Sequence, residues 1–267
     1  MAGGKLQHYS FIEPRYFPNQ LAKLMPNDQH PPHVVTLGEQ LIAQVYNTLR
    51  AQEGLWKKTL LIVIWDEHGG CFDHVQPPAA QPPDDGRVHD AFGWNRFGVR
   101  IPALLISPWI PAGTILRPPG ETPFDHTSVM ATARKCLGIN AKPLTGRDAA
   151  APDLTGALKL GPGDLNLGPT SIPVPVYTPT PDEVTAAAQQ PLNGMQHSLL
   201  YAAAAMPPGE HLLAAAEALR SGVTLHDLLR GTLTPGNALP HRTPAEALPD
   251  LQNQLAAVLG RDLRETG

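Results

Sequence analysis

Two runs of consecutive apolar residues stand out along the chain, TLLIVIW at 59–65 and IPALLIS at 101–107. Neither run alternates between apolar and polar positions, which is typical of strands buried on both faces of a parallel sheet. Pro102 and Pro108 confine the second run, because proline cannot donate to a strand ladder. A weaker run, YSFIEP at 9–14, predicts a third short strand. Together these runs predict an α/β fold.

Helical spacing precedes the first of the two apolar runs and follows the second. Between residues 36 and 51 an apolar side chain recurs at every fourth position, at Leu37, Leu41, Val45 and Leu49. Thr36 and Glu39 have the spacing of a capping box at the start of this helix. A second helix is predicted over 127–137, with Asp125 or Thr127 as its N-cap and a glycine directly after it.

The composition of the chain changes near residue 150. We expect an α/β domain over residues 1–159, a proline-rich linker over 160–181 and an alanine-rich helical extension over 182–267. Within the extension the sequence predicts four helices, near residues 182–190, 193–205, 208–220 and 243–260.

Charge and composition exclude several classes of function. The net charge of −4 gives no basic patch, so we expect no nucleic-acid partner. No apolar stretch approaches the length of a transmembrane helix, and the N-terminus shows no signal peptide. As written, the sequence is expected in the cytoplasm, although its localisation is open. Two cysteines, Cys71 and Cys136, form either one bridge or two reduced thiols.

Candidate chemistry begins where the first apolar run ends, in the segment DEHGG at 66–70. Buried charges are costly unless something compensates them. Asp66 and Glu67 therefore either lie at a solvated strand end or hold a hard divalent cation, which prefers oxygen ligands. The spacing alone leaves both interpretations open.

The histidines near this segment are also open to two interpretations. His30 lies beside two prolines and is either a packed loop residue or a site residue, and His68 is either a structural residue or a supporting one. Asp125 and His126 are an attractive pair, yet Asp125 fits equally well as a helix N-cap. His33 has no companion in the sequence that distinguishes it from a surface residue.

Several motifs occur in a family-like order: FIEPRYF, NDQHPP, GEQLIAQVYNTL, TLLIVIWDEHGGCFDHV, FGVRIPALLISPWI, FDHTSVMATARKCLG and LTGRDAAAP. Together they resemble the carboxyl-terminal half of the bacterial phosphoesterase family. That family contains the non-haemolytic phospholipases C and a related acid phosphatase, and it belongs to the alkaline-phosphatase-like superfamily. The resemblance covers residues 8–150 and depends on the ordered run of motifs rather than on one of them.

The resemblance implies a fold, a reaction and site residues. It implies part of an alkaline-phosphatase-like α/β/α sandwich and the hydrolysis of a phosphate ester or phospholipid through a covalent phospho-enzyme. Asp66 and Glu67 match the acidic pair that binds the family's divalent metal ion. His30 matches a histidine that contacts the phosphoryl group, and His68 and His74 match further motif positions, of which we take His68 as catalytic.

The family's E-N-R-S-F-D-H-type motif and its hydroxyl nucleophile do not occur in this sequence. We therefore expect a truncated phosphoesterase that has lost an amino-terminal half. The alternatives are an inactive pseudoenzyme, a metal- or phosphate-binding remnant, and one subunit of a split phosphoesterase. Because few strands are predicted, the isolated chain is expected to be marginally stable or oligomeric.

Overall fold

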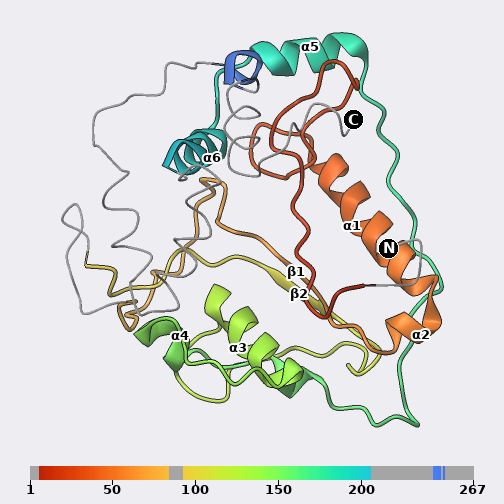
Figure 1. The fold of residues 1–267 in the computed structure, drawn as a ribbon, viewed down its shortest axis with the longest axis vertical. Helices are drawn as coiled ribbons and strands as arrows, with labels where there is room; N and C mark the ends of the chain where they lie inside the picture. The colour runs from red at the N-terminus through yellow and green to blue at the C-terminus, as the bar shows by residue number, and fades with distance from the viewer. Residues whose placement is uncertain (1–5, 84–92, 206–242, 248, 250–267) are drawn as a thin grey trace. The chain divides into compact units, whose positions relative to one another are not determined.

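A computed structural model describes residues 6–83, 93–205, 243–247 and 249 (Figure 1). Its packing divides the chain into two compact units. The first contains the described residues of Met1–Ile12 and Gln40–Val174, and the second contains those of Glu13–Glu39 and Pro175–Gly267. The division into residues 1–159, 160–181 and 182–267 stays a prediction.

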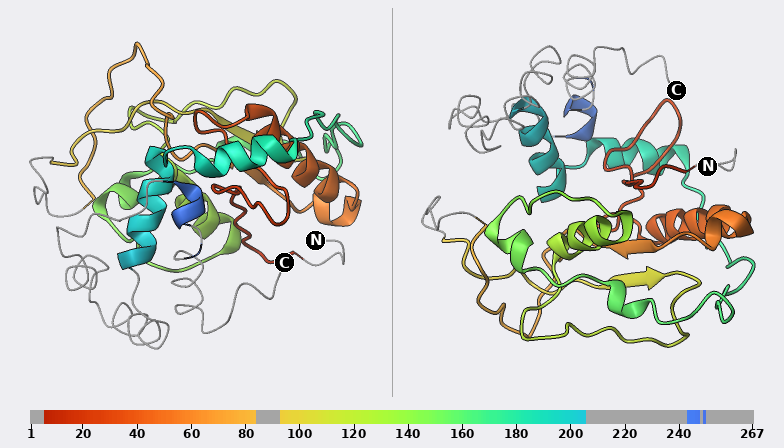
Figure 2. Two further views of the ribbon diagram at one scale, coloured as in Figure 1. Left: turned by 90° about the horizontal axis from the view of Figure 1, so that it is seen from above. Right: turned by 60° about the horizontal axis from the view of Figure 1, so that its bottom comes forward.

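The sheet of the first unit consists of two antiparallel strands, β1 (Leu61–Ile64) and β2 (Ala103–Ile106). Figure 2 shows the two arrows side by side and pointing in opposite directions. The predicted α/β character is confirmed in this small form, but the prediction of a parallel sheet is wrong. The physical reason is the connection. A parallel pair needs a crossover, whereas the segment between the strands folds back on itself at the Ala79–Arg96 bridge.

The strands are also less buried than their apolar sequences predict. All four residues of β1 are half-buried, and Ala103 and Leu104 of β2 are exposed. The prediction that these strands are buried on both faces is therefore wrong for the described part of the chain. The run YSFIEP forms no strand, because Tyr9 lies in a bend and residues 10–14 have no regular secondary structure.

Helix α1 (Val35–Arg50) confirms the helix predicted from the four-residue spacing. It begins one residue before Thr36, and the Val34 carbonyl accepts a hydrogen bond from the amide of Leu37 at 3.0 Å. Thr36 therefore lies inside the first turn rather than at the N-cap, so the predicted capping box does not form there. An N-cap residue has non-helical backbone angles, which Thr36 lacks.

The core of the first unit joins α1, the short helix α2 (Glu53–Trp56) and the sheet. The rings of Tyr46 and Trp56 meet edge to face, with centroids 5.5 Å apart. Both rings also hold the segment around Leu167, because Trp56 Nε1 donates to the Leu167 carbonyl at 2.9 Å and Tyr46 Oη donates to the Pro169 carbonyl at 2.7 Å. Partly buried side chains that pack on this core include Leu61 of β1 and Ile106 of β2.

Helix α3 (His126–Leu137) confirms the second predicted helix and its N-cap. Asp125 caps it through a capping box with Ser128, and Gly138 ends it in the left-handed conformation at φ 62°. The short helix α4 (Gly146–Ala150) follows and packs against α3. The chain then forms a 3-10 turn, η1 (Thr155–Ala157).

A buried ion pair fastens α4 to α3. The Arg134 guanidinium donates two hydrogen bonds to the Asp148 carboxylate, at 2.9 and 2.7 Å, and the amide of Leu144 donates a third at 2.8 Å. The Asp148 side chain is 1% exposed. The bidentate geometry and the third donor compensate the cost of burying this charge.

The second unit contains α5 (Pro181–Gln189) and α6 (Gly194–Ala205), close to the first two helices predicted for the extension. Its core is formed by Phe17, Leu192, Leu200 and Ala247. Gln196 is buried and donates to the Tyr16 carbonyl at 2.7 Å. The helix predicted at 208–220 lies outside the described residues, and of the one at 243–260 the structure describes a helical segment at 244–247.

Among the described residues, no helix combines the length and the apolar character that crossing a membrane requires. Cys71 and Cys136 are both exposed and free, so the reading of two reduced thiols is confirmed.

We expect Trp56→Ala to lower the free energy of unfolding by about 3–5 kcal/mol, because it empties the centre of the first core and leaves the Leu167 carbonyl without its donor. Urea denaturation measures this change. Trp94→Ala is the matched control. Because Trp94 is 44% exposed, this substitution should lower the free energy of unfolding by less than about 1 kcal/mol. Equal losses in the two variants would contradict the assignment of Trp56 to the core.

A second prediction concerns the acid stability of the α3–α4 pair. The Arg134 guanidinium lowers the pKa of Asp148, against the opposing effect of burial. A lowered folded-state pKa gives stabilisation that is present above the unfolded-state pKa, near 3.9, and is lost as the pH falls through the folded value.

Asp148→Asn should therefore cost about 3 kcal/mol at pH 7 and progressively less below pH 4. Urea denaturation at several pH values measures both effects. Asp164→Asn, at an exposed position, is the control and should change little at any pH. A cost for Asp148→Asn that stays constant from pH 7 to pH 3 would exclude the ion pair as its cause.

Candidate functional site

The acidic pair lies directly beyond β1, at the carboxyl end of the strand. Trp65 follows the strand and is half-buried. Asp66 is exposed, and Glu67 is half-buried. Within the described residues the Asp66 carboxylate makes no hydrogen bond or ion pair, whereas Oε2 of Glu67 accepts a hydrogen bond from the amide of Gly69 at 2.7 Å. The pair therefore presents one free carboxylate and one that its own turn holds in place.

Two glycines make the turn that holds Glu67. Gly69 and Gly70 have φ angles of 62° and 74°, in the left-handed region that favours glycine. His68 closes the turn, because its Nδ1 lies 2.8 Å from the Cys71 carbonyl and its own carbonyl accepts from the Cys71 amide at 3.0 Å. A carbonyl can only accept, so Nδ1 of His68 carries the proton and Nε2 of the neutral ring keeps its lone pair.

His126 approaches the same strand end from the first residue of α3. Its Nε2 lies 2.9 Å from the carbonyl oxygen of Trp65, the residue before Asp66. Nε2 therefore donates, and Nδ1 of the neutral ring is the free acceptor. In the sequence His126 and Asp125 are adjacent, and this alone left the role of each residue open. Only the fold shows that Asp125 is the cap and that His126 reaches the acidic strand end.

Three hydroxyl groups near β2 and the start of α3 are all engaged in local structure. Ser128 is fully buried and accepts from the amide of Asp125 at 3.1 Å. Thr127 Oγ1 donates to Asp125 at 2.6 Å, and Ser107 Oγ donates to the Thr59 carbonyl at 2.8 Å. These contacts describe caps and a strand end rather than an exposed nucleophile.

Asp73 and His74 have different environments although they are adjacent. Asp73 accepts two hydrogen bonds from Arg100, both 2.8 Å long, and a third from the amide of Val75 at 3.0 Å. The Arg100 guanidinium lowers the pKa of Asp73 well below its usual range. His74 is 83% exposed and lies 3.6 Å from Asp73. Asp73 therefore bonds to an arginine instead of facing the acidic pair as a third ligand.

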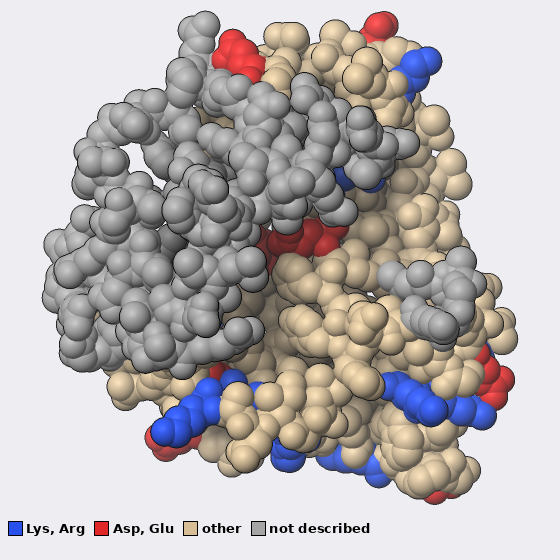
Figure 3. All heavy atoms as spheres, in the orientation of Figure 1, with Lys and Arg blue, Asp and Glu red and all other residues tan. Residues whose placement is uncertain are grey.

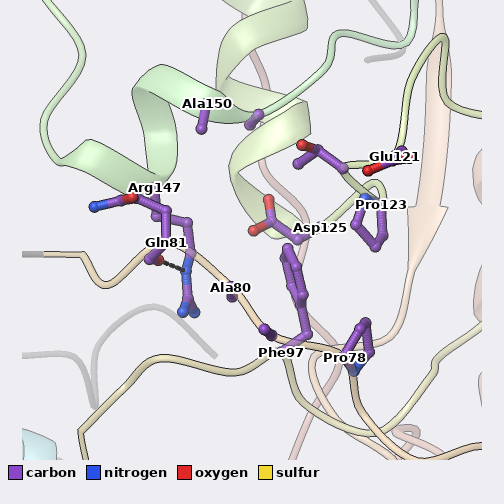
Figure 4. A pocket seen from close by; sticks show the side chains of 12 residues that line it. Pro78, Ala80, Gln81, Phe97, Glu121, Pro123, Asp125, Arg147 and Ala150 are labelled. Carbon is purple, nitrogen blue, oxygen red and sulfur yellow. Dashed lines mark hydrogen bonds between the residues drawn. The ribbon is translucent and has the colours of Figure 1, made fainter.

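A cavity of about 370 Å³ lies beside the N-terminus of α3. Figure 4 shows Asp125 and Phe97 bordering it, with Arg147 and Gln81 on the other side. Arg147 donates to the Gln81 carbonyl at 2.9 Å and lies over the Phe97 ring, 5.5 Å from its centroid. The cavity thus has a carboxylate wall and a guanidinium wall, with small apolar residues between them.

His30 belongs to the second unit, in the loop before α1. Its Nδ1 lies 2.7 Å from the Pro31 carbonyl, so this ring too carries its proton on Nδ1. In the same loop Nδ1 of His33 meets the carboxylate of the buried Asp28. No partner of His33 could be predicted from the sequence, because a residue five positions away in a loop has no regular spacing that reveals the contact.

The donor set of the acidic pair is small. Within the parts of the chain that the structure describes, no three His, Cys, Asp or Glu side chains are placed to share one metal ion. Asp66 and Glu67 thus offer two carboxylates, which is the number that Mg²⁺ commonly takes from a protein when water and substrate phosphate supply the rest.

Basic side chains form no extended surface on the face shown in Figure 3. Lys and Arg lie there in several separate groups, most of them near the lower edge and others in the upper part of the view, with Asp and Glu near some of them.

Comparison with known proteins matches residues 1–140 to the phosphoesterase family. The chain is 44% identical to non-specific phospholipase C1 of Arabidopsis thaliana over 156 residues, which are 55% of this chain and 29% of the relative. It is 37% identical to non-specific phospholipase C3 of the same plant over 217 residues, 78% of this chain and 40% of the relative. Phospholipase C A of Mycobacterium tuberculosis is 32% identical over 161 residues, 52% of this chain and 30% of the relative.

The chain thus spans less than half the length of each of these three relatives. The segment that matches the phosphoesterase family contains His30, the acidic pair and His126.

Substitutions in the glycine turn test its backbone conformation. We expect Gly70→Ala to destabilise the protein by about 1 kcal/mol, because alanine is strained at φ 74° although its Cβ would meet no atom within 4 Å. Gly54→Ala is the matched control. It also meets no atom, but it lies in helix α2 and should be neutral or stabilising by up to about 1 kcal/mol. Thermal denaturation of both variants measures the difference, and a destabilisation of the same size in both would refute the left-handed turn.

Proposed function

Since the chain belongs to the phosphoesterase family, we propose that it is a phosphoric ester hydrolase that uses a divalent metal ion bound by Asp66 and Glu67. The observation that carries this proposal is the pair of carboxylates at the carboxyl end of β1, where the glycine turn fixes Glu67 and leaves Asp66 free. Hard divalent ions prefer such oxygen ligands.

The substrate class follows from the relatives. The Arabidopsis and mycobacterial proteins are named as phospholipases C, so we propose a phosphate ester of the phospholipid type for this chain as well. An acid phosphatase acting on simpler monoesters is the second candidate. Both reactions break a bond between phosphorus and an alcohol oxygen, and both use the same acidic pair.

The residues around the pair have distinct parts in this proposal. Asp66 and Glu67 would hold the divalent ion, which would polarise the phosphoryl oxygens and offset their negative charge. The turn of His68 and the two glycines keeps the Glu67 carboxylate in one orientation. His126 holds the Trp65 carbonyl and so fixes the backbone from which Asp66 projects. His68 presents Nε2 as a lone pair in the neutral ring and as a donor when protonated, which is the chemistry of a residue that contacts a phosphoryl group. The assignment of His30 to the phosphoryl group stays a prediction from the family resemblance.

We also propose that β1 and β2 belong to an alkaline-phosphatase-like α/β/α sandwich. Two observations support this. Both strands are apolar but only half-buried or exposed, and within the described residues β1 has a ladder partner on one side only. Such strands gain burial when further strands and helices cover them.

The double variant Asp66→Asn, Glu67→Gln tests the function and the metal together. The purified chain should hydrolyse p-nitrophenyl phosphate after dialysis against EDTA and addition of Mg²⁺, Mn²⁺ or Zn²⁺, and the double variant should lose at least about 100-fold in kcat/KM. Mn²⁺ binding followed by electron paramagnetic resonance gives a second readout, and the variant should not bind the ion.

Asp164→Asn is the control for this experiment, since it removes an exposed carboxylate outside the site. It should keep both activity and Mn²⁺ binding. Turnover that survives in the double variant would show that the acidic pair does not carry the reaction. Mn²⁺ binding that survives would show that the ion binds elsewhere.

A further inference from the structure

The turn after the acidic pair carries an aromatic ring in water. Phe72 is 92% exposed and follows Glu67 by five positions. Burial of a phenylalanine side chain is among the largest single hydrophobic gains that a protein can make. Exposed apolar side chains are common on protein surfaces, however. The way in which the chain presents this ring therefore decides whether it has a role.

Both neighbours of Phe72 are fixed in place. The Cys71 amide donates to the His68 carbonyl at 3.0 Å, and the Cys71 carbonyl lies 2.8 Å from Nδ1 of His68. On the other side, the Asp73 carboxylate accepts two hydrogen bonds from Arg100, both 2.8 Å long, and a third from a nearby backbone amide. The Asp73 side chain is only 11% exposed. Because the backbone is held on each side, the turn keeps the Phe72 ring outward.

The residues around the ring combine apolar and hydrogen-bonding groups. Val75 is 37% exposed, and the His74 side chain is 83% exposed. The Arg100 side chain is 60% exposed and bonds to Asp73 through Nε and Nη2, so its Nη1 makes no hydrogen bond within the described residues. We refer to Phe72, His74, Val75 and Arg100 as the outer patch.

The size and the composition of the outer patch favour one kind of partner. A stable contact with a second protein buries about 800 Å² on each side, whereas a phenylalanine ring offers only about 200 Å². A lipid surface needs no such area. Its boundary between headgroups and acyl chains accepts single aromatic rings, with cationic and hydrogen-bonding side chains directed to the phosphates. Phe72 beside Arg100 and His74 has this composition.

We infer that the outer patch contacts a phospholipid surface, with the Phe72 ring between headgroups and acyl chains and with Arg100 and His74 hydrogen-bonded to lipid phosphates. The inference rests on the proposed function, because a hydrolase of phospholipids must reach a bond that lies at such a surface. Five residues span at most about 18 Å. A lipid surface that touches Phe72 therefore lies within reach of the acidic pair.

Binding to vesicles in the presence of EDTA measures this contact without hydrolysis. The probe is a vesicle of phosphatidylcholine at millimolar lipid, and sedimentation gives the bound fraction. We expect Phe72→Ser to lower the partition coefficient by about tenfold, because the ring no longer enters the lipid. Ile115→Ser is the matched control. Ile115 is 80% exposed in the loop between β2 and α3, and this variant should bind like the wild type.

Phe72→Trp gives a second readout, because it keeps an aromatic ring and adds a fluorophore. Vesicles with brominated acyl chains quench a tryptophan that enters them. The variant should bind like the wild type and lose more of its emission than the wild type does. Ile115→Trp is the control and should show no added quenching. Circular dichroism establishes that each variant is folded, and if Phe72→Ser does not fold, the quenching of Phe72→Trp decides.

Several outcomes would overturn the inference. Vesicle binding that Phe72→Ser leaves unchanged would exclude the ring from the contact, and so would equal quenching of Phe72→Trp and the wild type. A wild-type dimer that Phe72→Ser converts to a monomer, as measured by light scattering, would assign the ring to a second copy of the chain.

The measurements separate this inference from the function on which it rests. A wild-type chain that hydrolyses p-nitrophenyl phosphate but does not bind vesicles overturns the lipid contact alone. A chain that binds vesicles through Phe72 but hydrolyses no phosphate ester after addition of a divalent metal ion overturns the proposed function and leaves the lipid contact in place.

Discussion

Leu61 pairs with Ile106 and Ile64 with Ala103, and the arrangement of the first unit depends on this four-residue antiparallel ladder. The ladder fixes where β1 ends, and therefore where the acidic pair leaves the sheet. It also places the start of β2, and with it Arg100 and its partner Asp73, beside the same strand end. Leu61 and Ile106 pack on the core of Tyr46, Leu49 and Trp56, which joins the sheet to the helices. Because a register shift of one residue would turn every side chain to the other face, the acidic end and the core are specified together.

Polar groups beyond the ladder hold loops in place through few but well-directed hydrogen bonds. Glu67 accepts from its own turn, Asp125 caps α3, and Asp148 joins α3 to α4 through Arg134. His126, at the start of α3, then reaches the Trp65 carbonyl. Each link converts a loop of low intrinsic order into a defined position for a side chain. A phosphoester site needs this kind of order, since its charged groups are useful only at fixed positions.

The histidines illustrate how such positions acquire chemical roles. His30, His33 and His68 all engage Nδ1, whereas His126 engages Nε2. The partners differ as well, since three rings meet a backbone carbonyl and His33 meets a buried carboxylate. A carbonyl orients a ring, and a carboxylate both orients it and balances its charge. Four residues of one type are therefore chemically different, and the difference comes from their hydrogen-bond partners.

The sequence by itself determined helices α1 and α3, the cap of α3 and the position of the acidic pair after β1, because these depend on neighbours along the chain. The four-residue spacing predicted α1, Asp125 and Gly138 bounded α3, and the ordered motifs identified the family. Tertiary structure alone decided the antiparallel pairing, the incomplete burial of β1, the contact of His126 with Trp65 and the pairing of Asp28 with His33. An apolar run states that a segment avoids water, but it does not state which segment will cover it. Likewise, a histidine in a loop takes its tautomer and its role from whichever acceptor the folded chain brings to its ring, and no local spacing encodes that meeting.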